Sequence, residues 1–265
     1  MPCRLNRCSF SNTGQESIDM NKIIDLTMPI YEGMPQHPSH GRTPMFLTGT
    51  RTHDVWRSFS RKNYYNEEDL VSFQNENIIV CGHTGTHMDS CFHGDPESPY
   101  TIDKMPIECG FGDAIWLDVS HRFGPKARIT AKDLKEAEAK TGTSVRKGDI
   151  VLIFTGWSAI QDPASYALDH MGLSIDAGEW LREKQVKTVG IDTCNVDAPG
   201  ELTLPVHMNF LRPRSLGLGN DAFIAIIENL VNINRIPKSR FLFSGAPIPY
   251  LGGTGGQVRA LAIVD

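Results

Sequence analysis

Short apolar runs rich in Ile and Val recur along the chain from residue 21 onward, and turn-forming residues such as Gly, Pro, Asp and Asn bound them. Runs of about four to eight such residues are typical of β-strands. They occur at Asn77–Cys81, Ala114–Val119, Asp149–Phe154, Thr188–Ile191, Ala222–Ile227, Arg240–Phe243 and Val258–Val264. The pattern therefore predicts a fold that is rich in strands.

Two further segments have the features of helices. Thr130 is a suitable N-cap, Asp133 follows it three residues later, and apolar positions continue to a stop at Gly142. A second helix is expected from Ser174 toward Lys184. With more strand than helix, the predicted fold class is α/β with a few helices.

Length and composition suit a soluble enzyme. The 265 residues suit a single domain, which we expect to span 21–265, because residues 1–20 are polar in the manner of disordered segments. The net charge of −5, without a basic stripe, argues against nucleic acid or an anionic membrane as partner. No apolar run suits a membrane span or a signal peptide, and six cysteines without a CxxC pair favour a reduced cytoplasm. We expect a cytoplasmic protein with a small-molecule substrate.

The densest chemistry lies between His83 and His93, where three of the nine histidines and Asp89 fall within eleven residues. Imidazole and carboxylate are ligands of zinc, manganese and iron. If the segment is extended, alternate side chains share one face, which then carries all three histidines and Asp89, while Gly85 leaves room for an ion. A helix would also pair these residues, but Gly85 and two β-branched threonines disfavour it. A polar loop merely rich in histidine is the alternative; this set of residues favours a metal site.

Glu228 is a second candidate, because it ends the apolar run Ala222–Ile227 and should be buried. Burying an unpaired carboxylate costs on the order of several kcal/mol, so Glu228 needs a cation or a strong donor beside it. A metal ion is one such partner. A hydrogen bond or an ion pair with Arg259 is the alternative.

Three further polar residues are ambiguous. His207 follows Pro205 as a lone histidine, and from the residues alone a structural role is the simpler interpretation. Asp192 and Asp197 come after the strand expected at Thr188–Ile191. They could line the same site or cap a turn, and both interpretations stay open.

The run from His83 to Asp89, followed by His93, resembles the H-x-G-T-H-x-D-x-x-x-H signature of the metal-dependent cyclase superfamily. That superfamily includes bacterial kynurenine formamidases, isatin hydrolases and trans-dienelactone hydrolases. The resemblance covers nearly the whole chain from about residue 21, with further matching segments in family order at Asp25–Ile30, Gly33–Pro35, Gly190–Asp192, His207, Ile227–Leu230 and Val258–Ala260. It implies a swivelling β/β/α fold and a homo-oligomer, either a homodimer or a homotetramer.

The resemblance also implies a set of metal ligands, carried over position by position. His83, His87 and Asp89 match the ligands of a first divalent ion, Zn²⁺ or Mn²⁺. Asp89 would bridge to a second ion whose remaining ligands match His207 and Glu228. We therefore expect one or two ions per chain.

His93 matches the family's catalytic histidine, whereas no substrate-binding residue can be assigned. Two features depart from the family pattern. Ser90-Cys91 stands where the family has a small residue and then proline, and Cys91 falls on the ligand-facing parity, so a thiolate near the metal is an open alternative. The stretch from His207 to Glu228 is longer than in the compact kynurenine formamidases, which leaves the exact substrate open.

The expected chemistry is hydrolysis. A bound divalent ion lowers the pKa of its water from 15.7 to roughly 7 and polarises a carbonyl oxygen. His93 suits the general acid–base role, which is typically worth about 10²–10⁴-fold in rate. The chain has no G-x-S-x-G nucleophile elbow, and Gly252–Gly256 lacks the Lys-Ser/Thr of a phosphate loop, which makes it more typical of a turn at a pocket rim.

Three functions are compatible with these residues. The leading prediction is a metal-dependent hydrolase that cleaves the amide C–N bond of an aryl formamide or a cyclic amide. The alternatives are a lactone (ester) hydrolase with the same ions and a non-catalytic metal-binding protein, against which the intact His93 and Glu228 argue. Candidates for stacking on a flat substrate, which could equally be core residues, are Trp56, Phe59, Tyr64 and Tyr65.

Overall fold

One large mixed sheet organises the chain. The computed structural model describes residues 23–40, 45–48, 52–160 and 162–264. The strands of the large sheet are β1 (Ile23–Asp25), β4 (His87–Asp89), β5 (Phe111–Asp118), β7 (Ile150–Phe154), β9 (Thr188–Ile191), β10 (Ala225–Glu228), β11 (Arg240–Ser244), β12 (Gly255–Gln257) and β13 (Leu261–Ile263). In the described residues these nine strands lie in the order β1-β13-β11-β5-β7-β9-β10-β4-β12. Two small sheets pair β2 (Met45–Thr48) with β3 (Glu76–Ile79), and β6 (Arg128–Ile129) with β8 (Gly172–Leu173).

The centre of the large sheet is parallel and buried on both faces. Strands β5, β7, β9 and β10 pair in parallel, whereas β11 and β4 flank them in antiparallel pairing. A parallel strand covered on both faces has no solvent side, and its sequence is therefore almost continuously apolar. The run Ile150-Val-Leu-Ile-Phe154 of β7 is an example.

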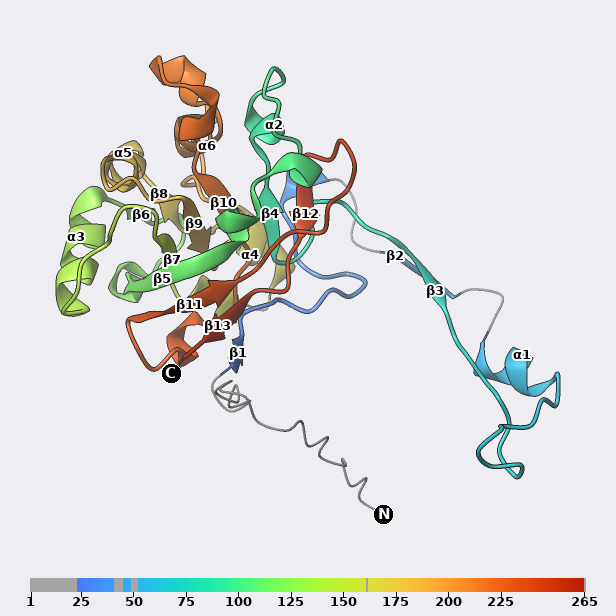
Figure 1. The fold of residues 1–265 in the computed structure, drawn as a ribbon. Helices are drawn as coiled ribbons and strands as arrows, with labels where there is room; N and C mark the ends of the chain where they lie inside the picture. Colours follow the sequence, from blue (N-terminus) through green and yellow to red (C-terminus); the bar gives the residue numbers. More distant parts are fainter. Residues whose placement is uncertain (1–22, 41–44, 49–51, 161, 265) are drawn as a thin grey trace, which may run out of the picture.

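Helices α3 (Ala131–Lys140), α5 (Ile175–Glu183) and α6 (Pro205–Leu211) cover one face of this sheet (Figure 1). The other helices of the described residues are α1 (His53–Arg57), α2 (Cys91–Gly94) and α4 (Pro163–Leu168). Leu134 of α3, Trp180 of α5 and Phe210 of α6 share one apolar cluster with Ile153 and Ile191 of the sheet. The opposite face is closed by the curl of the sheet itself. Its outer strands β11 and β13 contribute Phe243 and Ala262 to the cluster that contains Ile227 of β10.

The strand-rich α/β prediction is confirmed, and most elements lie where they were expected. Strand β9 has the predicted bounds, and the other predicted strands and both predicted helices are present with shifted ends. The run expected at Ala222–Ile227 begins later, because Asn220–Ala222 forms a 3₁₀ turn before β10. The expectation for residues 1–20 lies outside the described residues. No helix in the described ranges is long and apolar enough to cross a membrane.

The strand expected at Asn77–Cys81 lies outside the main sheet. It forms β3, which pairs only with β2 among the described strands and exposes all four of its residues. Figure 1 shows β2, β3 and α1 projecting together from the body. We call residues 45–79 the arm; the structure describes 45–48 and 52–79 of them.

A capping box formed by Thr130 and Asp133 begins α3, as the sequence predicts. The Thr130 hydroxyl accepts from the Asp133 amide at 3.3 Å, and the Asp133 carboxylate accepts from the Thr130 amide at 2.8 Å. Replacing Thr130 with Ala should reduce the free energy of unfolding by about 1 kcal/mol, because the cap is lost. Thr130→Ser keeps the hydroxyl and should stay close to wild type. Urea unfolding measures both, and equal losses in the two variants would contradict the capping role.

Candidate metal centre

Three of the predicted ligands share one face of the sheet where β4 pairs with β10. In this register His87 lies opposite Glu228, and Asp89 lies opposite Ile226. Opposed residues of antiparallel strands project from the same face, as do residues two apart on one strand. The side chains of His87, Asp89 and Glu228 therefore point the same way, and all three are buried. Strand pairing thus joins Glu228 to a motif that is far away in the sequence.

His83 and His93 reach the centre from outside β4. The prediction of one extended segment is wrong, because only His87–Asp89 is a strand, His83 lies in the preceding turn and His93 lies in α2. The alternation of side chains between two faces of an extended chain is interrupted at Gly85, whose φ of +64° lies in the left-handed region that favours glycine. Folding nevertheless gathers the same side chains. His83 Nδ1 is 2.7 Å from Asp89 Oδ1, and the rings of His83 and His93 are 4.3 Å apart.

His207 joins the centre from α6, where Asp197 holds its ring. The Asp197 carboxylate accepts from the backbone amides of Val206 and His207 at 2.7 and 3.0 Å, which satisfies free N–H groups in the first turn of the helix. It also accepts the Nδ1 proton of His207 at 2.6 Å. Nε2 then lies 3.5 Å from Asp89 Oδ2 and 3.6 Å from Glu228 Oε1. A carboxylate behind the imidazole is a common support for a histidine ligand.

His87 is oriented by the backbone of its own turn. Its Nδ1 donates to the Gly85 carbonyl at 2.9 Å, so Nε2 carries no proton in the neutral ring. That Nε2 atom is 3.4 Å from Asp89 Oδ1 and 3.6 Å from Glu228 Oε2. It faces the two carboxylates with its lone pair.

This set of atoms fits a divalent cation. Among the described residues, His87 Nε2 and Asp89 Oδ2 are buried without a hydrogen-bond partner, although buried polar atoms are nearly always satisfied. Ligand atoms of His87, Asp89 and Glu228 lie within 4.8 Å of one another, and so do those of His83, Asp89 and His93. Asp89 belongs to both groups. Converging imidazole nitrogens and carboxylate oxygens are the donors that zinc and manganese accept.

Burial and mutual charge dominate the electrostatics of the centre. Burial raises the pKa of Glu228, and the negative charge of Asp89 adds to the shift. Burial also opposes ionisation of Asp89, but the imidazoles beside it, His83 first, hold its pKa well below the usual range. Despite burial, the hydrogen bond to Asp197 and the nearby carboxylates of Asp89 and Glu228 raise the pKa of His207 to about 10. A cation would replace protons here, because metal ligands must be deprotonated.

His93 stands at the solvent side of the centre. The residue remains partly exposed, while its ring lies against His83 and 6.0 Å from the ring of His207. Desolvation lowers the pKa of His93 to about 4, against the attraction of Asp89. The imidazole is therefore neutral at pH 7 and able to accept a proton.

Cys91 is turned away from the ligands. It begins α2 and is buried in the apolar cluster that includes Met88, Met105 and Cys109. Burial raises the pKa of its thiol to about 12. The short helix breaks the alternation on which the thiolate alternative depended, and the thiol is protonated at neutral pH.

Contacts outside the centre decide the roles of Asp192 and Arg259, which the sequence left open. Asp192 accepts from the backbone amides of Thr155 and Gly156 at 2.8 and 2.9 Å, so it caps the turn after β7. Arg259 pairs with Asp25 at 2.6 Å and is therefore not the counter-charge of the buried glutamate. Thus Asp197 supports the centre, whereas Asp192 and Arg259 have structural contacts.

The aromatic candidates lie on the arm. Trp56 packs against Phe59 and Phe73 with ring centroids 6.0 and 5.3 Å apart. Tyr64 and Tyr65 contact each other and are 91% and 92% exposed. Within one chain these residues form surface clusters, because the arm carries them away from the body (Figure 1).

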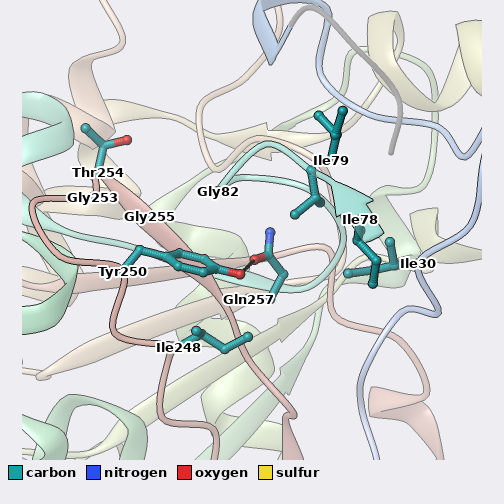
Figure 2. Close-up of a pocket in the computed structure, with 11 residues that line it drawn as sticks. Ile30, Ile78, Ile79, Gly82, Ile248, Tyr250, Gly253, Thr254, Gly255 and Gln257 are labelled. Atoms are coloured by element: carbon teal, nitrogen blue, oxygen red, sulfur yellow. Dashed lines mark hydrogen bonds between the residues drawn. The ribbon is translucent and has the colours of Figure 1, made fainter. Parts of the chain in front are cut away.

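A pocket with a volume of about 840 Å³ opens beside the centre. Figure 2 shows its apolar walls and the polar pair Tyr250 and Gln257, joined by a hydrogen bond of 2.9 Å. Thr254 lines the pocket and lies 3.0 Å from His83 Nε2 through its hydroxyl. A Cβ atom at Gly255 would come within 2.6 Å of the His83 ring, so glycine is needed for this close approach. The prediction that Gly252–Gly256 forms a turn at a pocket rim agrees with this lining. The contact between Thr254 and His83 was not predicted from the sequence.

Comparisons with known proteins agree with the resemblance seen in the sequence. Residues 24–198 match the model of the family described as "Putative cyclase". A kynurenine formamidase of Geobacillus thermodenitrificans is 26% identical over 241 residues, which cover 91% of this chain and 97% of the relative. An isatin hydrolase of Roseibium aggregatum is 27% identical over 205 residues, 71% of this chain and 74% of the relative.

Comparison with solved structures leads to the same family. Isatin hydrolase A from Ralstonia solanacearum has a TM-score of 0.69 to this structure at 25% identity, with 92% of each chain covered. The family match spans more than half of the chain and includes the run from His83 to His93. This chain therefore belongs to the cyclase family.

Proposed function

We propose that this chain is a metal-dependent hydrolase that cleaves the amide C–N bond of an aryl formamide or a cyclic amide. The observation that carries the proposal is the buried set of His87, Asp89 and Glu228, with unpartnered lone pairs on the first two, beside the neutral imidazole of His93. The relatives named kynurenine formamidase and isatin hydrolase support the amide class of substrate.

The divalent ion or ions would be held by His83, His87, Asp89, His207 and Glu228. Zn²⁺ or Mn²⁺ suits this mixture of imidazole and carboxylate. Asp89 belongs to both groups of donor atoms, which supports two ions per chain with Asp89 shared. The groups pair His87 with Glu228 and His83 with His93, so they divide the donors differently from the ligand sets that the resemblance implies. A bound ion supplies Lewis acidity, which lowers the pKa of water toward neutrality and polarises a carbonyl group.

His93 supplies the proton transfers. Its neutral ring can take a proton from the attacking water and return it to the departing nitrogen, which is a poor leaving group until it is protonated. Asp89 stabilises the imidazolium that forms in between, since its charge already raises the pKa of His93 against desolvation. Asp197 keeps His207 directed at the centre through the bond to Nδ1.

The neighbouring pocket supports an aryl substrate. Its volume of about 840 Å³ falls in the usual range for small-molecule sites, and its walls include Ile30, Ile78 and Ile248. Tyr250 and Gln257 offer polar atoms within the same pocket. A lactone hydrolase would use the same centre, but neither the relatives nor the pocket favours it over amide hydrolysis. A non-catalytic metal protein would have no use for His93.

Metal content tests the ligand set. His87→Ala should lose bound metal and activity together, because it removes a ligand atom that has no other partner. The near-isosteric Glu228→Gln should lower the content from about two ions per chain toward one, as expected for a two-metal site. Elemental analysis of the purified proteins measures both, with His53→Ala on the arm as a metal-replete control. Full metal content in His87→Ala would refute its assignment, and a wild type that holds one ion in excess zinc or manganese would refute the two-ion site.

Turnover tests the reaction. The metal-loaded protein should hydrolyse members of a panel of aryl formamides and cyclic amides faster than lactones. His93→Asn should retain its metal and lose at least about 100-fold in kcat on amides, the scale of general acid–base catalysis. Its loss on lactones should be smaller, because an alcohol departs more easily than an amine. Hydrolysis of lactones alone would replace the amide proposal, and an unchanged kcat in the metal-replete variant would remove His93 from the mechanism.

We also propose that the chain forms a homodimer or homotetramer through the arm. An isolated two-stranded ribbon is marginally stable in water. Strand β3 nevertheless exposes Ile78 and Ile79, and farther along the arm Phe59, Tyr64 and Tyr65 are 60%, 91% and 92% exposed. Two symmetric copies would present identical arms that can cover one another or the partner's body.

The four described cysteines are free, which supports a cytoplasmic location.

Light scattering after size exclusion tests the assembly. The wild type should have the mass of a dimer or tetramer at micromolar concentration, and Phe59→Asp combined with Tyr65→Asp should shift it toward the monomer. Ile107→Asp is the matched control, because Ile107 is 72% exposed on the body rather than on the arm. A wild type that is monomeric at every concentration would contradict the proposal.

A further inference from the structure

His40 is an imidazole beside the metal centre that the sequence pattern does not reveal. It ends the 3₁₀ turn Pro38–His40, outside the family signature. Its ring centroid lies 5.3 Å from that of His83 and 6.2 Å from that of His87. With His93 also against His83, the centre has two imidazoles in addition to those expected to be ligands.

The Nδ1 atom of His40 is buried and has no hydrogen-bond partner within the described part of the chain. The neighbouring His37 bonds within its own turn instead, with its Nδ1 2.7 Å from the Ser39 hydroxyl. Proteins rarely leave such an atom unsatisfied, and the exceptions call for a specific explanation, such as a bound molecule. His40 therefore has an unused hydrogen-bonding position next to the centre.

The turn that carries His40 is tied to the turn that carries His83. The Thr84 hydroxyl donates to the side-chain oxygen of Gln36 at 3.0 Å. The backbone of the turn is closed by the bond from the His40 amide to the His37 carbonyl at 3.0 Å. His40 is thus held in place by contacts that do not involve its ring nitrogens.

His40 differs from the metal ligands in its position. It belongs to neither group of donor atoms that lie within 4.8 Å of one another around Asp89. Its Nδ1 atom is buried without a partner, beside the rings of two expected ligands, His83 and His87. An imidazole ring can offer one N–H donor and one acceptor. These properties suit a hydrogen bond with a polar group of a bound molecule.

We propose that His40 is a substrate-binding residue whose Nδ1 hydrogen-bonds the amide group of the substrate. The inference rests on the proposed amide hydrolysis. An amide has both a carbonyl acceptor and, in formamides and cyclic amides, an N–H donor, so either tautomer of His40 finds a partner. The contact holds the scissile group beside His93 and satisfies the buried Nδ1 atom. His40 thereby distinguishes an amide from an apolar molecule of the same shape.

Calorimetric binding of benzamide to the metal-loaded protein tests the inference without relying on turnover. His40→Ala should keep its metal and its thermal stability but bind benzamide about 3- to 10-fold more weakly, the scale of one hydrogen bond. His40→Asn places an amide group near the former Nδ1 position and should restore much of the affinity. Ser39→Ala, an exposed change on the same turn, should bind like the wild type.

The outcomes separate the inference from the proposed function. Equal benzamide affinity in the wild type and His40→Ala, with amide turnover intact, would overturn the role of His40 alone. Loss of metal from His40→Ala would make His40 a ligand and also overturn it. A metal-loaded wild type that neither binds benzamide nor hydrolyses any amide would overturn the proposed function, and the role of His40 with it. If His40→Ala does not fold, His40→Phe, which keeps a ring but has no hydrogen-bonding atom, replaces it. Weaker benzamide binding by His40→Phe than by Ser39→Ala would support the role of His40, and equal binding would overturn it.

Discussion

Two buried carboxylates side by side, Asp89 and Glu228, are the constraint on which the centre depends. Removing carboxylates from water is costly, and their mutual repulsion in a region of low dielectric adds to the cost. Imidazoles surround the pair and offset this cost, and the raised pKa of His207 favours its positive charge. A divalent cation would neutralise both carboxylates at once. The register places Glu228 opposite His87, two residues from Asp89 on the same face of the sheet. This pairing brings the two carboxylates together and therefore creates the need for a cation.

Groups outside the centre hold its side chains in place. Asn229, at a φ of +59°, donates to the same Gly85 carbonyl that accepts from His87, at 2.9 Å in both cases. The amide oxygen of Asn229 in turn accepts from the hydroxyl of Tyr166 in α4 at 2.7 Å. Together with Asp197 behind His207, these bonds direct two imidazoles toward the carboxylates. Such supports matter because a loosely held ligand loses much of its affinity for a metal.

The substrate side of the centre is made from segments that are far apart in the chain. The pocket is walled by the base of the arm, through Ile78 and Ile79, and by the loop that carries Tyr250 and Thr254. The base of the arm lines the pocket, and its far end exposes Phe59, Tyr64 and Tyr65. Under the proposed assembly, this one segment of chain would take part in both subunit contact and substrate access.

The sequence by itself determined the features that depend on near neighbours. Thr188–Ile191 was recognisable as a strand because a buried parallel strand is continuously apolar, and Thr130 with Asp133 marked a helix start because the cap is local. The residue types in the run from His83 to His93 also favoured a metal site, and the likeness of this run to the cyclase signature identified the family. The resemblance implied that His207 and Glu228 lie near Asp89, whereas only the tertiary structure showed which elements bring them there. It alone also decided that Cys91 faces the apolar core and that the predicted strand at Asn77–Cys81 leaves the sheet. The reason is physical: local propensity sets the conformation of a few residues, whereas the direction of a side chain toward a distant partner depends on strand order, register and packing.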